Sequence, residues 1–133
     1  MNILIVDDDY ILAKGTAKLI ERLGNHKVAI TDEPTEIIQQ CESGMVDLVM
    51  MDINLPGAQW QGQEVTGAEL CRFLKTQPST AHIPIMLLTA YAMTNERQTL
   101  LFISQADEFC LKPITDYKAL LELIDKLCQL PEV

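Results

Sequence analysis

The side chains best suited to chemistry each directly follow an apolar segment: Asp7, Asp8, Asp52, Thr89 and Lys112. Carboxylates that lie close together repel one another and bind protons, which raises their pKa values. A divalent cation removes that cost, and Mg²⁺ fits because it prefers oxygen ligands and usually lies between carboxylates and a phosphate. An amine and a hydroxyl can hold phosphate oxygens, and an aspartate can accept a phosphoryl group as an acyl phosphate. These residue types indicate Mg²⁺-dependent phosphoryl transfer, with Asp52 as the acceptor.

Each of these residues also has an ordinary structural interpretation. An aspartate after a strand is commonly a helix N-cap, which applies to Asp8 and Asp9. Asp52 alone could be a turn residue before a loop. Thr89 or Lys112 alone carries little signal. The combination favours chemistry, because suitable groups at the ends of four strands are improbable by chance.

The elements that must position these residues are five strands. We predict them at Asn2–Val6, Lys27–Thr31, Val46–Met51, Pro84–Leu88 and Ala106–Leu111. Short apolar runs bounded by turn residues are typical of strands buried on both faces. Helical patterns between them predict an α/β fold, a doubly wound parallel sheet with helices on both faces. The carboxyl ends of parallel strands share one edge, so that edge would collect the candidate residues.

Apolar spacing and capping residues predict a helix after each strand. The first is expected to bury Leu12, Thr16, Leu19, Ile20 and Leu23 and to stop at Gly24-Asn25. The later helices are expected to start at Pro34, at the capping-box pattern Thr66-Gly67-Ala68-Glu69, at Thr94 and at Thr115-Asp116.

Charge and composition limit the partners and the setting. The 133-residue chain has a net charge of −9, which disfavours direct contact with nucleic acid or anionic membranes. No apolar run approaches the roughly 18 residues of a membrane-spanning helix, and the first residues lack the basic region of a signal peptide. The four cysteines form no CxxC pair and are typical of reduced thiols. We therefore expect a single cytoplasmic domain over residues 1–133.

The motifs around the candidate residues resemble the receiver domain of two-component response regulators. The resemblance covers about residues 2–128 and rests on the segments Ile3–Asp9, Asp47–Gly57, Pro84–Ala90 and Phe109–Pro113. It implies a flavodoxin-like fold with strand order 2-1-3-4-5. It also implies that a histidine kinase or histidine phosphotransfer protein phosphorylates Asp52, and that the signal passes to a downstream protein target without an output domain in this chain.

The resemblance implies a Mg²⁺ site with a role for each ligand. Asp8 would bind the ion directly and Asp7 mostly through water. Asp52 would contribute a carboxylate oxygen and Asn54 its backbone carbonyl. Such a protein catalyses only its own phosphotransfer and dephosphorylation, so we do not expect an enzyme with an external substrate.

The resemblance also implies how the phosphoryl group is held and sensed. Thr89, Lys112 and the backbone N–H groups of Asn54 and Ala90 would hold its oxygens, and Lys112 would precede a cis peptide bond to proline. Thr89 would then move toward the phosphoryl group while Phe109 turns inward. This switch would alter a surface made of the fourth helix, the fifth strand and the last helix. A plain core phenylalanine is the alternative interpretation of Phe109.

Three stretches depart from the family's usual pattern. The segment between Gly57 and Gly67 is longer than in most receivers and carries the only tryptophan, Trp60. It is either a flexible solvated loop or a lid or partner-recognition segment anchored by Trp60. Gln105 stands near where a glycine often closes the fourth helix, which predicts a different helix ending. The run Leu100–Ile103 is apolar all round, so we expect an outward-facing side chain there. It is either a homodimer contact or a run buried further by neighbouring elements.

Two other functions can be distinguished from phosphoryl acceptance on Asp52. A phosphatase similar to the haloacid dehalogenase family would use an aspartate after the first strand as nucleophile, here Asp7, but Ile11 stands where that motif needs Thr or Val. A receiver-like interaction module would work without phosphorylation, although all the key residues are present. Labelling at Asp52 with acetyl phosphate separates these alternatives.

Overall fold

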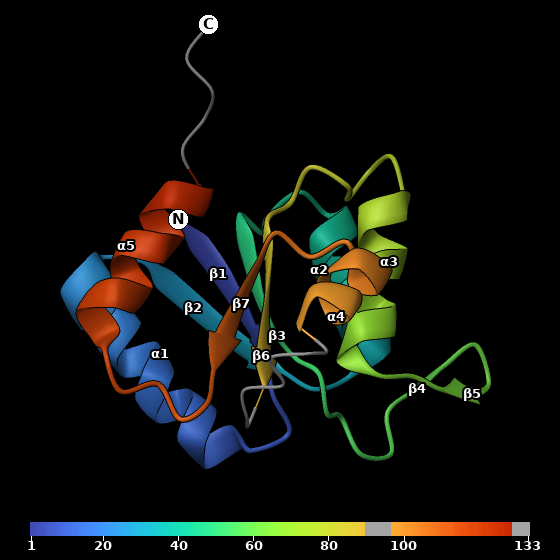
Figure 1. The fold of residues 1–133 in the computed structure, drawn as a ribbon, viewed down its shortest axis with the longest axis horizontal. Helices are drawn as coiled ribbons and strands as arrows, with labels where there is room; N and C mark the ends of the chain where they lie inside the picture. Colours follow the sequence, from blue (N-terminus) through green and yellow to red (C-terminus); the bar gives the residue numbers. More distant parts are fainter. Residues whose placement is uncertain (90–96, 129–133) are drawn as a thin grey trace, which may run out of the picture.

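The structure is a computed structural model that describes residues 1–89 and 97–128. Its centre is a parallel five-stranded sheet in the order β2-β1-β3-β6-β7 (Figure 1). The strands are β1 Asn2–Val6, β2 Lys27–Thr31, β3 Leu48–Asp52, β6 Ile85–Thr89 and β7 Glu108–Leu111. Counted along this sheet alone, the order is 2-1-3-4-5, which confirms the expected flavodoxin-like, doubly wound fold.

Helices cover both faces of the sheet. They are α1 Tyr10–Gly24, α2 Pro34–Glu42, α3 Gly67–Thr76, α4 Arg97–Ser104 and α5 Tyr117–Leu127. Figure 1 shows α1 and α5 on one face and α2, α3 and α4 on the other. Side-chain caps begin three of these helices, because Asp9, Thr66 and Asp116 each accept a hydrogen bond from a backbone N–H of the first turn. The predicted capping box of Thr66 and Glu69 is therefore confirmed.

The sheet separates two apolar layers. Alternate side chains of each strand point to opposite faces, so every central strand contributes to both layers. β3 is buried along its whole length. Toward α2 and α3 the strands contribute Leu4, Val6, Val49, Met51, Ile85 and Leu87. Toward α1 and α5 they contribute Ile3, Ile5, Leu48, Met50, Met86 and Leu88.

The buried face of α1 differs from the predicted one. The helix buries Ala13, Ala17 and Ile20, whereas Leu12 is 45% exposed and Leu23 is 58% exposed. Only Ile20 of the predicted face is fully buried. The physical reason is that small alanine side chains let the helix approach the sheet closely, which turns the larger leucines to the edges of the contact.

Five strand boundaries also differ from prediction. β3 begins at Leu48 and extends to Asp52, which pairs with Leu88. β6 runs from Ile85 to Thr89 and follows Pro84, which has no N–H to donate. β7 begins at Glu108, after Asp107, whose carboxylate accepts the Ile85 N–H at 2.8 Å. These shifts place the site residues at strand ends as expected.

The long segment between Gly57 and Gly67 contains a short hairpin, which neither of the two expectations for this segment included. β4 (Gln59–Trp60) pairs antiparallel with β5 (Gln63–Glu64). The intervening Gln61 and Gly62 have φ angles of 54° and 79°, the left-handed pair that a type I′ turn requires. The hairpin projects beyond α3 at the end of the sheet where the strands terminate (Figure 1).

The predicted change at the end of α4 is not observed. Gln105 adopts the left-handed conformation, φ 60°, that glycine usually supplies after a helix. Its N–H donates to the Leu101 carbonyl at 2.8 Å, and the preceding Ser104 is fully buried. The helix therefore closes in the ordinary way, with a residue that is less suited to the conformation than glycine.

Candidate functional site

The carboxyl ends of β1 and β3 bring two buried aspartates to one lysine. Lys112 Nζ lies 2.8 Å from Asp7 Oδ2 and 2.8 Å from Asp52 Oδ2. Asp7 is 5% exposed and Asp52 is 6% exposed, whereas Asp8 is exposed at the rim. Asp7, Asp52 and Lys112, three of the five candidate residues, therefore form one ion-paired group.

Backbone groups fix the second oxygen of each buried carboxylate. Asp7 Oδ1 accepts the Asp9 N–H at 3.0 Å, and Asp52 Oδ1 accepts the Asn54 N–H at 3.1 Å. Each carboxylate is thus held by a main-chain donor on one oxygen and by Lys112 on the other. Bonds at both oxygens hold each carboxylate in a single orientation, which a reacting group needs.

The end of β7 places Lys112 beside Thr89. Thr89 pairs with Leu111 in the β6–β7 register, and the Lys112 N–H donates to the Thr89 carbonyl at 2.6 Å. The bond from Lys112 to Pro113 is cis, as predicted. Thr89 is buried and ends β6 at the same edge of the sheet as Lys112.

A glycine that the sequence did not single out touches the backbone of Asp52. A Cβ on Gly67 would collide with the Asp52 carbonyl oxygen, and it would lie 3.0 Å from the Ile53 Cα. The Gly67 N–H also donates to the Ile53 carbonyl at 2.8 Å. The first residue of α3 is therefore pressed against the acceptor strand. A glycine at the first position of a capped helix was the available signal.

Burial and charge oppose each other at this site. Burial raises the pKa of Asp52, the hydrogen bonds from Lys112 and Asn54 lower it, and the charge of Asp7 raises it, with a raised value as the result. Burial would lower the pKa of Lys112, but its hydrogen bonds to Asp52 and Asp7 outweigh that effect and raise it. The lysine is therefore held as an ammonium ion at neutral pH.

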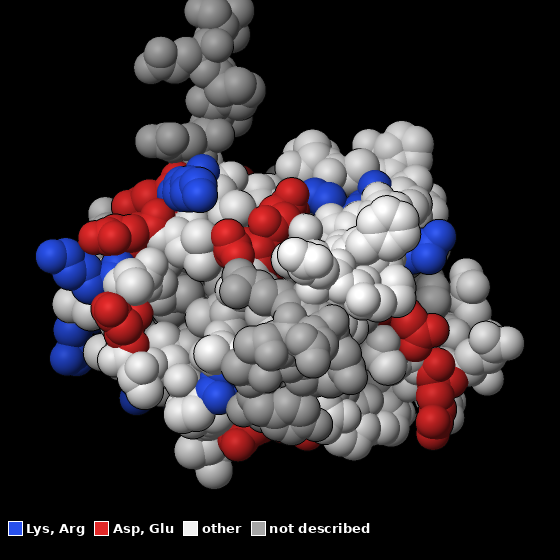
Figure 2. Space-filling model, viewed as in Figure 1, with Lys and Arg blue, Asp and Glu red and all other residues white. Residues whose placement is uncertain are grey.

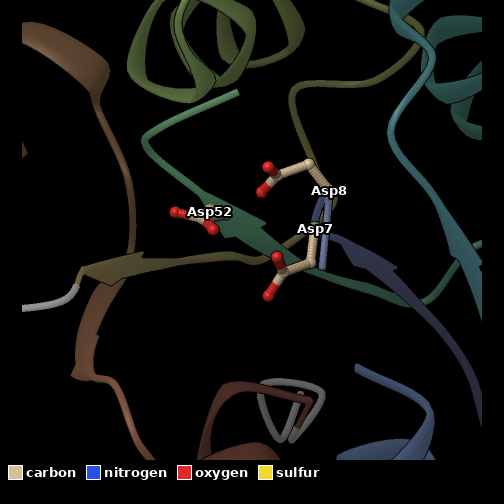
Figure 3. Close-up of side chains that lie close together, drawn as sticks. All are labelled: Asp7, Asp8 and Asp52. Atoms are coloured by element: carbon tan, nitrogen blue, oxygen red, sulfur yellow. The ribbon is translucent and has the colours of Figure 1, made fainter. Parts of the chain in front are cut away.

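The three carboxylates form a set of oxygen donors suited to a hard cation. Asp7, Asp8 and Asp52 each offer an oxygen within 4.8 Å of the others, and Figure 3 shows them around a common space at the ends of their strands. Sites for Zn²⁺ or Cu²⁺ usually include His or Cys ligands, whereas Mg²⁺ prefers carboxylate oxygen and water. The residues present fit the predicted Mg²⁺.

One predicted contributor to the site, Ala90, lies outside the described residues, as does the expected helix start at Thr94. Phe109 is described and is 7% exposed, within the apolar layer that contains α2 and α3. Its side chain is thus already directed inward, and its switching role stays a prediction.

Two apolar surfaces lie on α1 and α4. Ile11, at the start of α1, is 87% exposed, and the neighbouring Tyr10 is 58% exposed. On α4, Phe102 is 86% exposed, which confirms the outward-facing side chain expected there. Figure 2 shows uncharged side chains gathered over α4. Of the helices in the described ranges, none has the length and apolar character needed to cross a membrane.

Sequence comparisons identify one family. The family model of the response regulator receiver domain matches residues 3–125. The chain is 30% identical over 129 residues to the chemotaxis protein CheY of Pseudomonas aeruginosa, covering 96% of this chain and 95% of that protein. It is 34% identical over 115 residues to the cyclic di-GMP phosphodiesterase response regulator RpfG of Xanthomonas campestris, covering 86% of this chain but only 28% of that longer protein.

Comparisons with solved structures show the same fold. A putative response regulator from Chloroflexus aurantiacus superposes with a TM-score of 0.78 at 26% identity, covering 96% of both chains. The receiver domain of a sensor histidine kinase from Pseudomonas aeruginosa has the same fold, with a TM-score of 0.77 at 21% identity and 96% coverage of each chain. That structure holds a magnesium ion in its active site cleft.

Proposed function

The chain belongs to the response regulator receiver family of two-component signalling, and from this premise we propose that it accepts a phosphoryl group on Asp52 in a Mg²⁺-dependent reaction. The observation that carries the proposal is the shared ammonium group. Lys112 bonds to both Asp7 and Asp52, and Asp8 completes the donor set at the rim. Residues 1–133 would act as one receiver unit, with a histidine kinase or a histidine phosphotransfer protein as the donor.

The transfer itself needs little beyond placement and charge compensation. An Asp52 oxygen attacks the phosphorus of a phosphohistidine, an O–P bond forms, and the N–P bond breaks. The electron pair leaves with the imidazole, which takes up a proton. Lys112 and the Thr89 hydroxyl would hold phosphoryl oxygens as charge shifts onto them, with the Asn54 N–H as a further donor.

Mg²⁺ would be held by Asp7, Asp8, Asp52 and the backbone carbonyl of Asn54. It supplies positive charge that neutralises the phosphoryl oxygens and the clustered carboxylates. The burial of Asp7 and Asp52 supports this role, because electrostatic interactions strengthen where water is excluded. The acyl phosphate would be lost by hydrolysis at the same site, so the protein acts on its own aspartate rather than on an external substrate.

The two apolar surfaces suit the two partners of a relay. The exposed Tyr10 and Ile11 adjoin the N-cap Asp9 beside the site, which places them where a phosphodonor protein must approach. The α4–β7–α5 surface carries the exposed Phe102 and Leu111. We assign this second surface to the downstream target or to a second copy of the chain, with Thr89 and Phe109 as the switch beneath it. Direct contact with nucleic acid is disfavoured by the net charge of −9.

Incubation with acetyl phosphate and Mg²⁺, followed by peptide mass spectrometry, tests the proposal. We expect a phosphoryl group on Asp52 that is absent from Asp52→Asn and absent when Mg²⁺ is chelated. Asp47→Asn, an exposed carboxylate before the same strand, is the matched control and should label normally. A label on Asp7 instead would favour the phosphatase alternative. An unlabelled, folded protein would favour an interaction module that works without phosphorylation.

A further inference from the structure

The hairpin after Asp52 is tied to the acceptor loop at its base. The Ala58 N–H donates to the Leu55 carbonyl at 3.1 Å, and the Val65 N–H donates to the Ala58 carbonyl at 3.0 Å. The chain then enters α3, where the Gly67 N–H bonds to Ile53. One end of the hairpin thus joins the loop at Leu55, and the other end leads into Gly67, whose backbone contacts that of Asp52.

One side chain attaches the hairpin to the body of the protein. Within residues 59–64, all of them described, Trp60 is half-buried and the other five residues are exposed. Its ring meets Phe73 of α3 edge to face, with centroids 5.8 Å apart and planes at 63°. That geometry is favourable for aromatic pairs. The hairpin therefore packs against α3 through this aromatic pair, and its strand β4 also lies next to α2.

The contact is made by the ring and not by a hydrogen bond. Trp60 Nε1 is buried and has no hydrogen-bond partner within the part of the chain that the structure describes. A buried N–H without a partner is unfavourable and is rare in folded proteins. The ring keeps this position in spite of that cost, and its edge-to-face packing against Phe73 is a contact that offsets it.

We propose that Trp60 is a positioning residue for Asp52, acting through Phe73 and the first turn of α3. The inference rests on the proposed phosphoryl transfer to Asp52. α3 is a rigid connection because its capping box fixes the first turn, and the Gly67 backbone touches the Asp52 carbonyl. Displacement of Phe73 therefore displaces the surface that holds Asp52 in place. The additional residues between Gly57 and Gly67 would thus position Asp52 rather than form a lid over it.

The first measurement is the rate of phosphorylation by phosphoramidate with saturating Mg²⁺, well below the melting temperature. Trp60→Ala should transfer about tenfold more slowly, because small misplacement of reacting groups is costly. Trp60→Phe keeps a ring against Phe73 and should restore most of the rate. Trp60→Ala combined with Phe73→Ala should be no slower than the slower single variant, since both remove one contact.

A stability-matched control separates positioning from general loosening. Ile124→Val removes a methylene group from the opposite apolar layer, between α5 and the sheet, and has no path through the hairpin. It should lower the melting temperature without slowing the transfer. An unchanged rate in Trp60→Ala overturns the inference, as does an equal slowing in Ile124→Val. A wild type that is not phosphorylated would overturn the proposed function together with this inference. A wild type that is phosphorylated at the same rate as Trp60→Ala would overturn the inference alone.

The fluorescence of Trp60 supplies a second readout. If Trp60 helps to position Asp52, occupation of Asp52 should alter the surroundings of the Trp60 ring. Trp60 is the only tryptophan, so intrinsic fluorescence reports it alone. Beryllium fluoride with Mg²⁺, a phosphoryl analogue on the aspartate, should change the emission of the wild type but not of Asp52→Asn. Emission that stays unchanged while the analogue is bound contradicts the coupling.

Discussion

The Cα of Gly67 lies against the carbonyl oxygen of Asp52 so closely that a methyl group does not fit between them. The first helical residue of α3 and the proposed phosphoacceptor are thus in direct contact through their backbones. Any larger residue at position 67 must push α3 or the end of β3 away, and both carry groups that the site uses.

Gly67→Ala should therefore lower both stability and transfer. We expect about 1–3 kcal/mol of destabilisation from overpacking and a transfer rate reduced by about tenfold or more. The matched control is Gly15→Ala, where a Cβ meets nothing within 4 Å and the residue lies inside α1. That change should stabilise by about 0.5–1 kcal/mol, because alanine favours the helix. Chemical denaturation should show a lower free energy of unfolding than the wild type for Gly67→Ala and a higher one for Gly15→Ala. A change of the same sign in both variants would contradict the contact between Gly67 and Asp52.

The raised pKa of Asp52 makes folding depend on pH in a defined direction. The folded protein holds the Asp52 proton more tightly than the unfolded chain does, because burial raises this pKa. The contribution of Asp52 to stability is thus fully present below its unfolded pKa and is lost as the pH rises through the folded value. Asp52→Asn should consequently be more stable than the wild type at pH 7 without Mg²⁺, and this advantage should shrink toward pH 3.

Thermal melts of both proteins between pH 3 and pH 8 in EDTA measure this effect. Asp47→Asn, which changes an exposed carboxylate at the other end of the strand, should show no such pH-dependent advantage. An advantage for Asp52→Asn that grows toward low pH would mean that Lys112 outweighs burial at this site.

Mg²⁺ should stabilise the folded protein through the three carboxylates. A ligand that binds only the folded state at 100 times its dissociation constant adds about 2.7 kcal/mol. For a domain of this size, that corresponds to a rise of roughly 5–10 °C in melting temperature. Asp8→Ala should abolish most of the rise, since Asp8 belongs to the donor set. Asp32→Asn, an exposed acidic residue outside that set, should retain it, and calorimetry in Mg²⁺ and in EDTA compares them.

The cysteines should differ sharply in reactivity. Cys41 and Cys71 are fully buried, and burial raises their pKa values to about 11 and about 12. Cys110 and Cys128 are only half-buried. Iodoacetamide at pH 8 should therefore modify the latter pair first, as followed by peptide mass spectrometry. Early modification of Cys71 in a protein that remains folded would contradict its packing.

Ionisation of the buried thiols should destabilise the folded protein at high pH. A thiol whose folded pKa is raised contributes stability below its unfolded pKa of about 9, and that contribution is lost as the pH rises toward about 12. Cys71→Ala should be less stable than the wild type at pH 7, because it leaves a cavity. The difference between the two proteins should narrow between pH 9 and pH 11 in urea denaturation.

The strand ends and most of the site were predictable because they depend on local patterns. Apolar runs that stop at Asp7, Asp52 and Lys112 locate the sheet edge without any knowledge of packing. The capping box at Thr66 likewise depends on residues close together in the sequence. Such features follow from spacing alone, and the structure places them as expected.

The predictions failed where the structure depends on packing between elements that are distant in the sequence. Periodicity favoured Leu12 and Leu23 on the buried face of α1, but small alanines govern how closely a helix approaches a sheet. The hairpin was missed because Gln61-Gly62 is a weaker turn signal than Asn-Gly, and its strands have two residues each. The contact of Gly67 with Asp52 joins two elements in space, and its only local signal was a glycine at the first position of a capped helix.

The position of Lys112 between two buried carboxylates has a consequence for the order of events in the cell. A protein whose acidic centre lacked an internal cation would need a metal ion to complete its folding, as zinc fingers do. Here the chain supplies its own counter-charge, so the domain can mature before any ion arrives. Folding therefore does not depend on magnesium, and under the proposed function the ion is needed only for phosphoryl transfer.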